Sequence, residues 1–197
     1  MAMIHLEPQT LEMFSRALDG LKPPPNLSLS QWADKYRKLS AEASASQGQW
    51  NTDAAPFQRE IMDAIGDVHI RKVVAMMCAQ AGKTEGLILN TIGFYMDYHP
   101  ASIMVMQPTV NLGESFSKDR LTPMLRDTPA LRGLVNTKSR YSGNTISKKN
   151  FPGGMLVIVG ANAPTDLRSR PIKVLLADEV DAYKASAGKE GDPVMLA

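Results

Sequence analysis

The chain has 197 residues, 44% of them hydrophobic, so it can bury a core and has the size of one domain with an arm. No secretory signal or apolar stretch near the roughly 20 residues of a membrane span is visible, and the single Cys78 excludes an internal disulfide, so a soluble protein of a reducing compartment is expected. The net charge is only +2, but residues 118–173 carry 11 Lys or Arg against 3 Asp or Glu, which favours a face for a polyanion or a solvated basic surface.

Residues 1–49 are expected to form a helical arm and linker laid over a core domain at 50–197. A short helical pattern within the first 20 residues is followed by the stiff, helix-breaking run KPPPN at 22–26. Ser28 and Gln31 then have the spacing of a capping box. The helix that follows carries three apolar or aromatic residues at helical intervals, expected to be packing anchors: Trp32, Tyr36 and Leu39.

The first helix expected in the core domain lies within residues 50–67, in the sequence APFQREIMDAIGD. Its apolar face is formed by Ile61, Met62 and Ile65. Gln58 lies near its start, and a glutamine amide can pair with both N6 and N7 of adenine. Gln58 is therefore a candidate for binding a nucleotide base, although an ordinary surface glutamine on a helix explains the pattern nearly as well.

The next elements have the order of a phosphate-binding loop. The apolar run VVAMMC at 73–78 predicts a strand, AQAGKTE a tight loop, and 84–98 a helix. In this geometry Lys83 would reach the β- and γ-phosphates of a nucleotide and Thr84 would bind Mg²⁺. Met77 stands where the full pattern G-x-x-x-x-G-K-[ST] has its first glycine, so the match is incomplete. The candidate phosphate-binding residues are Gln80, Ala81, Gly82, Lys83 and Thr84.

Further strands and helices alternate along the rest of the chain. A strand is expected at 102–109, a helix at 110–126 with a kink at Pro123, and a hairpin within 141–160 that turns at FPGG. The second arm of the hairpin, the strand at 102–109, the run before the phosphate loop and a strand near 173–177 are the four candidate strands of the sheet. The fold class is therefore expected to be α/β, a three-layer domain with a mostly parallel central sheet.

The strand at 173–177 ends in two adjacent carboxylates, within KVLLADEVD. Asp178 would hold Mg²⁺, and Glu179 would orient and polarise an attacking water. A solvated acidic turn after a core strand is the alternative. The sequence AQAGKTE upstream favours a site for a nucleoside triphosphate with Mg²⁺.

Several ordered blocks resemble the ATPase half of the large terminase subunit of tailed bacteriophages, of the lambda-like type. The resemblance covers residues 28–183 and rests on WNTDAAPFQREIMDAI, AQAGKTE, IMVMQPT and FPGGMLVIVGANAPTDLRSRPIKVLLADEVD. It implies a P-loop NTPase of the ASCE type, truncated at its C-terminus, that hydrolyses ATP to move double-stranded DNA into a procapsid. The implied partners are that DNA, the small terminase subunit, the portal protein and further copies of the chain. The implied location is the host cytoplasm, without a membrane.

The resemblance also implies roles for single residues. Lys83 and Thr84 fall on the Walker A residues, Asp178 on the Mg²⁺ carboxylate and Glu179 on the catalytic glutamate. Gln58 falls near the adenine-recognition glutamine. In the full-length family a metal-dependent nuclease domain follows, and this chain ends at residue 197.

One departure concerns the phosphate loop, because some packaging ATPases have an arginine where this chain has Ala79. An arginine at the transferred phosphate accelerates the reaction by roughly 10³- to 10⁵-fold. Arg168 and Arg170, in the polar loop before the carboxylate strand, are candidates for this role in their own or a neighbouring subunit. Contacts with DNA phosphates or a helix cap would explain them equally well.

Two other functions remain open at this stage. DEVD also resembles the D-E-x-D box of helicase-like motors. A truncated, non-catalytic remnant that binds nucleotide or partner subunits is the second alternative.

Overall fold

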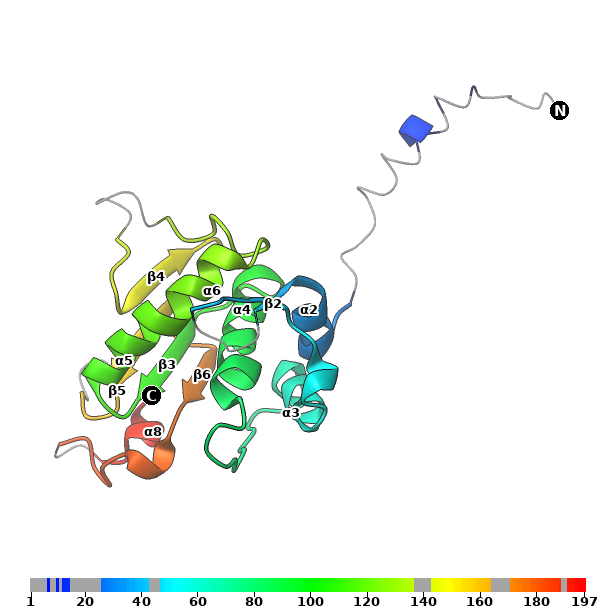
Figure 1. Cartoon of the computed structure of the whole chain (residues 1–197). Helices are drawn as coiled ribbons and strands as arrows, with labels where there is room; N and C mark the ends of the chain where they lie inside the picture. Colours follow the sequence, from blue (N-terminus) through cyan, green and yellow to red (C-terminus); the bar gives the residue numbers. More distant parts are fainter. Residues whose placement is uncertain are drawn as a thin grey trace.

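A four-stranded sheet lies at the centre of the computed structural model (Figure 1). The structure describes residues 7, 10, 12–14, 26–42, 47–136, 143–163, 171–188 and 191–197. The strands are β3 (Ile103–Gln107), β4 (Lys148–Phe151), β5 (Gly154–Gly160) and β6 (Val174–Ala177). Their order is β4-β5-β3-β6, with β5, β3 and β6 parallel and β4 antiparallel to β5. The mixed α/β class and the mostly parallel sheet are thereby confirmed.

The predicted hairpin is confirmed as the pair β4 and β5. The two strands are joined at Pro152 and Gly153, and Gly153 has a φ of +84°, which favours glycine. The FPGG sequence therefore supplies the turn residue that this backbone needs.

The helices predicted after Ser28, within 50–67, at 84–98 and at 110–126 are confirmed within a few residues. Leu39, expected on the same helix as Trp32 and Tyr36, lies instead in a short strand beyond its end, and the helix at Pro193–Leu196 was not predicted. The helical pattern expected in the first 20 residues lies mostly outside the described residues.

The observed helices are α2 (Leu29–Tyr36), α3 (Phe57–Gly66), α4 (Asn90–Asp97), α5 (Val110–Phe116), α6 (Thr122–Asp127) and α8 (Pro193–Leu196). Two π-helical segments, η2 (Thr84–Leu89) and η3 (Ser117–Leu121), precede α4 and α6, and two 3₁₀ turns are η1 (Thr52–Ala54) and η4 (Val180–Ala182). A short ladder pairs β1 (Lys38–Leu39) with β2 (Gly48–Gln49). No helix in these described ranges is both long and apolar enough to cross a membrane.

The kink predicted at Pro123 stays a prediction, although the π-helical segment η3 directly precedes the helix that contains this proline. Pro123 lies at the start of α6, directly after that segment, and has no N–H to continue the helical ladder. The run from α5 through α6 is otherwise continuous.

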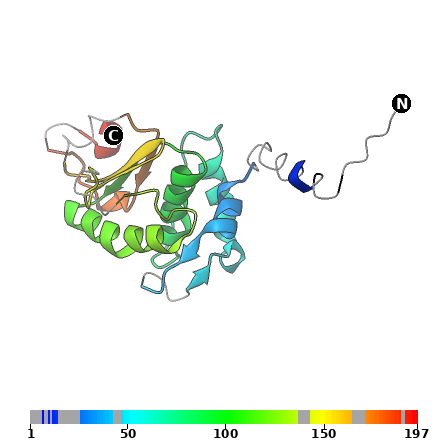
Figure 2. The same ribbon diagram turned by 90° about the horizontal axis from the view of Figure 1, so that it is seen from above.

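Two apolar clusters lie on opposite faces of the sheet, because side chains alternate along each strand. On one face, Ile103, Val105, Leu156 and Ile158 belong to a cluster that also includes side chains of α2, α4 and the run from α5 to α6. The opposite face, which includes Met104, Met106, Val157 and Val159, packs against Tyr183 and Leu196. Figure 2 shows α8 on the other side of the sheet from α5 and α6.

The helix α2 is joined to this core. Its capping box is confirmed, since the Ser28 N–H donates to Gln31 Oε1 at 3.0 Å and the Gln31 N–H donates to Ser28 Oγ at 3.4 Å. Trp32 is fully buried, donates from Nε1 to Asp97 at 2.8 Å and meets the Phe94 ring edge-on. The division of the chain at residue 50 stays a prediction.

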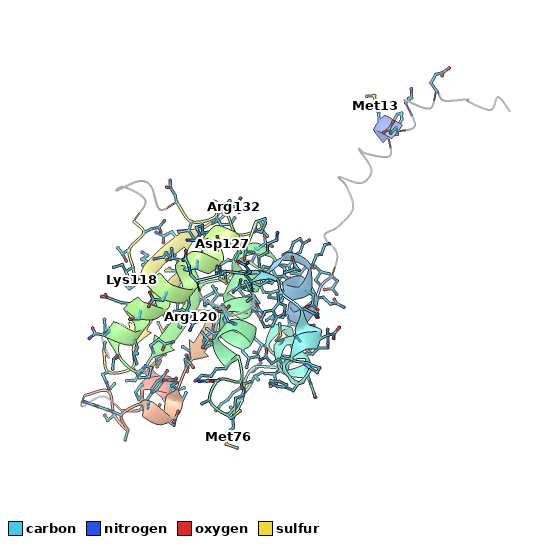
Figure 3. All side chains as sticks on the ribbon, viewed as in Figure 1. Met13, Met76, Lys118, Arg120, Asp127 and Arg132 are labelled. Atoms are coloured by element: carbon cyan, nitrogen blue, oxygen red, sulfur yellow. The ribbon has the colours of Figure 1, made fainter. Side chains whose placement is uncertain are left out.

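The strand predicted at residues 73–78 is wrong. This stretch has no regular secondary structure, and Val74 and Met76 are 80% and 100% exposed. Figure 3 shows Met76 at the tip of a loop, pointing away from the body of the protein. Both edges of the central strand β3 are paired, with β5 and β6, and residues 73–78 pair with none of the described strands. A β-branched apolar run forms a strand only where a partner satisfies its backbone groups.

Candidate nucleotide site

Lys83 belongs to the sequence AQAGKTE at residues 79–85, here named the GKT loop, and it contacts the two carboxylates that follow β6. Its Nζ lies 3.1 Å from Asp178 Oδ1 and 3.2 Å from Glu179 Oε1. Burial alone would lower the pKa of Lys83, but the hydrogen bonds and charges of the two carboxylates outweigh it and raise this pKa. The sequence-predicted residues Lys83, Asp178 and Glu179, 96 positions apart at most, thus form one charged cluster.

Asp178 is nearly buried and is held at the carboxyl end of the sheet. Its N–H donates to the Met106 carbonyl at 3.0 Å, which continues the pairing of β6 with β3. Gln107 donates from Nε2 to Asp178 Oδ2 at 3.2 Å. The Tyr183 hydroxyl donates to the same Met106 carbonyl at 2.8 Å, and burial, with the negative charge of Asp178, raises its pKa well above the ordinary value.

The backbone of the site is unusual at two points. Among the described residues, only Gln80 (φ +60°) and Glu179 (φ +54°) have a positive φ without being glycine. Such left-handed conformations are uncommon for residues with a side chain, and they concentrate at functional sites. At Glu179 this conformation turns the chain out of β6 and leaves the carboxylate side chain 49% exposed beside Lys83.

Gln58 lies directly beneath the GKT loop. It is 2% exposed, and its Nε2 donates to the Ala81 carbonyl at 2.7 Å. A Cβ atom at Gly86 would overlap the Gln58 amide, and one at Gly82 would come within 3.0 Å of it. Gln58 Oε1 is buried without a hydrogen-bond partner among the described residues. Whether this amide reads adenine stays a prediction, but its contact with the loop is an observed feature that the sequence did not indicate.

A pocket of about 640 Å³ lies between the loop and the segment that follows α2. This volume is in the range of about 300 to 1,000 Å³ that small-molecule sites occupy. The ring of Phe57 is 58% exposed and forms part of the lining. The other lining residues are Leu39, Gln49, Trp50, Asn51, Ala54, Ala55, Gln58, Gln80, Ala81, Gly82 and Glu85. An apolar cavity with an accessible aromatic ring and several amides suits the nucleoside part of a nucleotide.

A buried ion pair lies behind the loop. Arg37, which caps α2, places its guanidinium 2.7 Å from Glu85, the residue after Thr84, and also donates to the Lys38 carbonyl. Arg120 approaches Glu85 from η3 at 3.7 Å. Burial lowers the pKa of Arg37 and raises that of Glu85, so for both groups desolvation outweighs the mutual attraction.

The predicted residues thus divide into those near the site and those not described. Lys83, Asp178 and Glu179 are in contact, Gln58, Gln80, Ala81 and Gly82 line the adjacent pocket, and Thr84 begins η2 directly after Lys83. Arg168 and Arg170 lie outside the described residues.

The cluster suits a phosphate-bound cation. The Lys83 ammonium already occupies a position between two carboxylates, which shows that they can hold a positive charge. When Lys83 turns to phosphate oxygens, Asp178 and the Thr84 hydroxyl could hold Mg²⁺, whose preferred ligands are carboxylate and other oxygens.

Known proteins resemble this chain. A family model described as the ATPase domain of phage terminase large subunit gpA matches residues 44–197. "Terminase, large subunit" of Enterobacteria phage P21 is 31% identical over 175 residues, which are 88% of this chain and 27% of that protein. The protein of the same name from Escherichia phage lambda is 30% identical over 189 residues, 94% of this chain and 29% of its own length. The chain therefore spans less than a third of these relatives. No solved structure gives a significant match.

Proposed function

Because this chain belongs to the family of phage terminase large subunits of the gpA type, within its ATPase domain, we propose that it binds ATP with Mg²⁺ and hydrolyses it. The observation that supports this most directly is the position of Lys83 between Asp178 and Glu179, beside the GKT loop. We further propose that the energy released moves double-stranded DNA into a procapsid, in the host cytoplasm.

Each charged residue has a distinct task in the proposed reaction. Lys83 would leave the carboxylates and contact the β- and γ-phosphate oxygens, while Asp178 and Thr84 would hold the metal ion. Bound Mg²⁺ would neutralise charge on the phosphate oxygens. Glu179, half exposed and no longer paired with Lys83, accepts a hydrogen bond from the attacking water and aligns it with the γ-phosphate.

The pocket beside the loop would hold the nucleoside. Its position is supported by the contact of Gln58 with Ala81 and by the lining residues Gln80 to Gly82, which join the pocket to the phosphate side of the loop. Phe57 offers an exposed ring on which a base can stack. The unpaired, buried Oε1 of Gln58 can accept from the N6 amino group of adenine if the amide turns toward the pocket.

The proposed partners follow from family membership alone. They are double-stranded DNA, the small terminase subunit, the portal protein and further copies of this chain assembled on the procapsid.

The test measures ATP hydrolysis and nucleotide affinity of the chain, with and without Mg²⁺ and double-stranded DNA. We expect Mg²⁺-dependent turnover. Lys83→Ala should weaken binding, because Lys83 contacts the phosphates in the ground state. Glu179→Gln should bind ATP normally and hydrolyse it about 10²- to 10⁴-fold more slowly, because Glu179 acts only on the attacking water. Lys35→Ala, which removes an exposed lysine of α2 outside the basic segment at 118–173, is the matched control and should behave as wild type.

The outcomes separate the alternatives. Strand separation of duplex DNA would favour a helicase-like motor. Nucleotide binding without hydrolysis, in the presence of DNA as well, would favour the non-catalytic alternative. Wild-type turnover by Glu179→Gln would overturn the assignment of the carboxylates.

A further inference from the structure

Gln107 ends the central strand β3, next to the strand that carries Asp178. β3 and β6 are paired in parallel from Ile103 opposite Val174 to Met106 opposite Ala177. Gln107 and Asp178 are therefore the next residues along the two strands. The Gln107 side chain is 5% exposed and donates to Asp178 Oδ2 at 3.2 Å.

The two oxygens of Asp178 thus have different partners. Oδ1 faces the Lys83 ammonium at 3.1 Å, and Oδ2 accepts from the Gln107 amide. Lys83 is 34% exposed at the N-cap of η2, with a long side chain that can turn to a phosphate. Gln107 belongs to a strand paired on both edges, and its own carbonyl accepts from the Ala161 N–H at 2.8 Å. Nucleotide binding can remove the first partner of Asp178 but not the second.

The neutrality of the Gln107 amide matters as much as its position. A neutral amide fixes one carboxylate oxygen without repelling a nearby cation, whereas a lysine or arginine there would compete with Mg²⁺ for the same charge. With Oδ2 fixed, rotation of the carboxylate is restricted and Oδ1 keeps its direction toward the space that Lys83 vacates. Groups that hold metal-binding carboxylates in this way affect metal affinity strongly.

We infer that Gln107 is a positioning residue that orients Asp178 for Mg²⁺, an inference that rests on the proposed function. A purely structural role is the alternative, in which Gln107 only satisfies a buried carboxylate. The two roles predict different behaviour. A positioning role affects nucleotide binding only when Mg²⁺ is present, and a structural role affects it equally with and without the metal.

The test uses Gln107→Met, which keeps the length of the side chain and removes the donor. Affinity for a fluorescent ATP analogue is measured in excess EDTA and in Mg²⁺, and the ratio of the two dissociation constants gives the enhancement by the metal. We expect this enhancement to fall by about 10- to 100-fold, with the affinity in EDTA unchanged. Electron paramagnetic resonance of Mn²⁺ with the analogue present should show a matching loss of metal affinity.

Ser117→Ala is the control, because it also removes a buried hydrogen bond, from Ser117 Oγ to the Ile146 carbonyl, outside the site. It should retain the full enhancement. Gln107→Asn, too short to reach Oδ2, should reproduce the loss and serves as the second variant if the methionine variant does not fold.

An unchanged enhancement in a folded Gln107 variant, or an equal loss in EDTA and in Mg²⁺, would overturn the inference. A wild-type chain that binds no nucleotide under either condition would instead overturn the proposed function. The two failures are therefore distinguishable.

Discussion

Arg37 and Glu85 form a charged pair in an environment that favours neutral groups. The side chains are 2% and 14% exposed, and Arg37 Nε has no partner among the described residues. Burial lowers the pKa of Arg37 and raises the pKa of Glu85, so in both cases it favours the neutral form. Such a pair adds little net stability compared with apolar residues of the same size, but removing one member leaves an uncompensated buried charge.

We expect Arg37→Met to lower the free energy of unfolding by up to about 3 to 5 kcal/mol, because Glu85 loses its partner at 2.7 Å and keeps only the more exposed Arg120 at 3.7 Å. The double variant Arg37→Met with Glu85→Leu should recover most of this loss. Urea denaturation of the wild type, both single variants and the double variant measures the coupling. If the losses of the two single variants simply add up in the double variant, Arg37 and Glu85 are not energetically coupled. Arg126→Met, which breaks an exposed ion pair with Asp127, is the matched control and should change stability little.

The same variant should show a characteristic pH dependence. The pKa of Glu85 is already raised by burial, and loss of the Arg37 charge raises it further. When the pKa of a carboxyl group is higher in the folded than in the unfolded state, the protonated group favours folding. This contribution is complete below the unfolded pKa, which is near 4.5 for glutamate, and it is lost as the pH rises through the folded pKa. Arg37→Met should therefore approach wild-type stability as the pH falls from 7 toward 5. The double variant, which has no carboxyl group at position 85, should lack this recovery.

At the level of elements, local signals predicted local structure. The capping box at Ser28 and the turn residues Pro152 and Gly153 specify a helix start and a hairpin through contacts within a few residues. The run at 73–78 has strand composition, but a strand also needs a partner along its length. That partner depends on the whole sheet, so composition alone gave the wrong element.

The same distinction applies to the site. Lys83 and Asp178 were predictable because a phosphate loop and the carboxyl end of a parallel strand have recognisable sequences. The contacts of Gln107 with Asp178 and of Arg37 with Glu85 join residues 71 and 48 positions apart. The only signal for Gln107 was a polar residue that ends an apolar run, and Arg37 had none.

Helix α3 and the segment η2 meet where Gln58 packs against Gly86. Alanine is favoured over glycine in helices by about 1 kcal/mol, so propensity alone predicts that Gly86→Ala stabilises the protein. The added methyl group would instead overlap the Gln58 amide and displace it from Ala81. We expect Gly86→Ala to lower the melting temperature and weaken nucleotide binding.

Truncation of the opposing side chain provides the control for this variant. In a Gln58→Ala background the overlap disappears, and Gly86→Ala should become neutral or stabilising. If Gly86→Ala is as harmful in that background as in the wild type, the packing of Gln58 against Gly86 is not the cause.

At the scale of the whole molecule, the basic segment at 118–173 is partly neutralised. Lys118 pairs with Glu114, Arg126 pairs with Asp127 and Glu42, and Arg120 pairs with Glu85. Figure 3 shows Lys118 and Arg120 along the helical run from α5 to α6. Several acidic partners lie outside the segment, so its charge in sequence overstates the charge of the folded surface. A DNA-binding role for this segment stays a prediction.

Assembly can be tested through Arg168 and Arg170. If either arginine acts on the ATP of a neighbouring subunit, turnover per subunit should rise with protein concentration. An Arg168→Ala or Arg170→Ala subunit, inactive alone, should regain activity when mixed with a Glu179→Gln subunit that retains both arginines.

The control partner in this mixing experiment carries Glu179→Gln together with the same arginine substitution and should restore nothing. Failure of both mixtures, with turnover independent of concentration, would leave these arginines to DNA contacts or to structure.

The exposed stretch between α3 and the GKT loop also determines where the chain can be cut. It includes Arg71 and Lys72, both exposed and without regular structure, so trypsin is expected to cleave there. The cut would leave Lys83, Asp178 and Glu179 on the C-terminal fragment and Gln58 on the N-terminal one. The contact of Trp32 with Phe94 and the bond from Gln58 to Ala81 cross this boundary, so the two fragments should stay associated after cleavage. Co-expressed as separate chains, they would form a split protein in which the part of the pocket that carries Phe57 and Gln58 can be exchanged independently of the cluster of Lys83, Asp178 and Glu179.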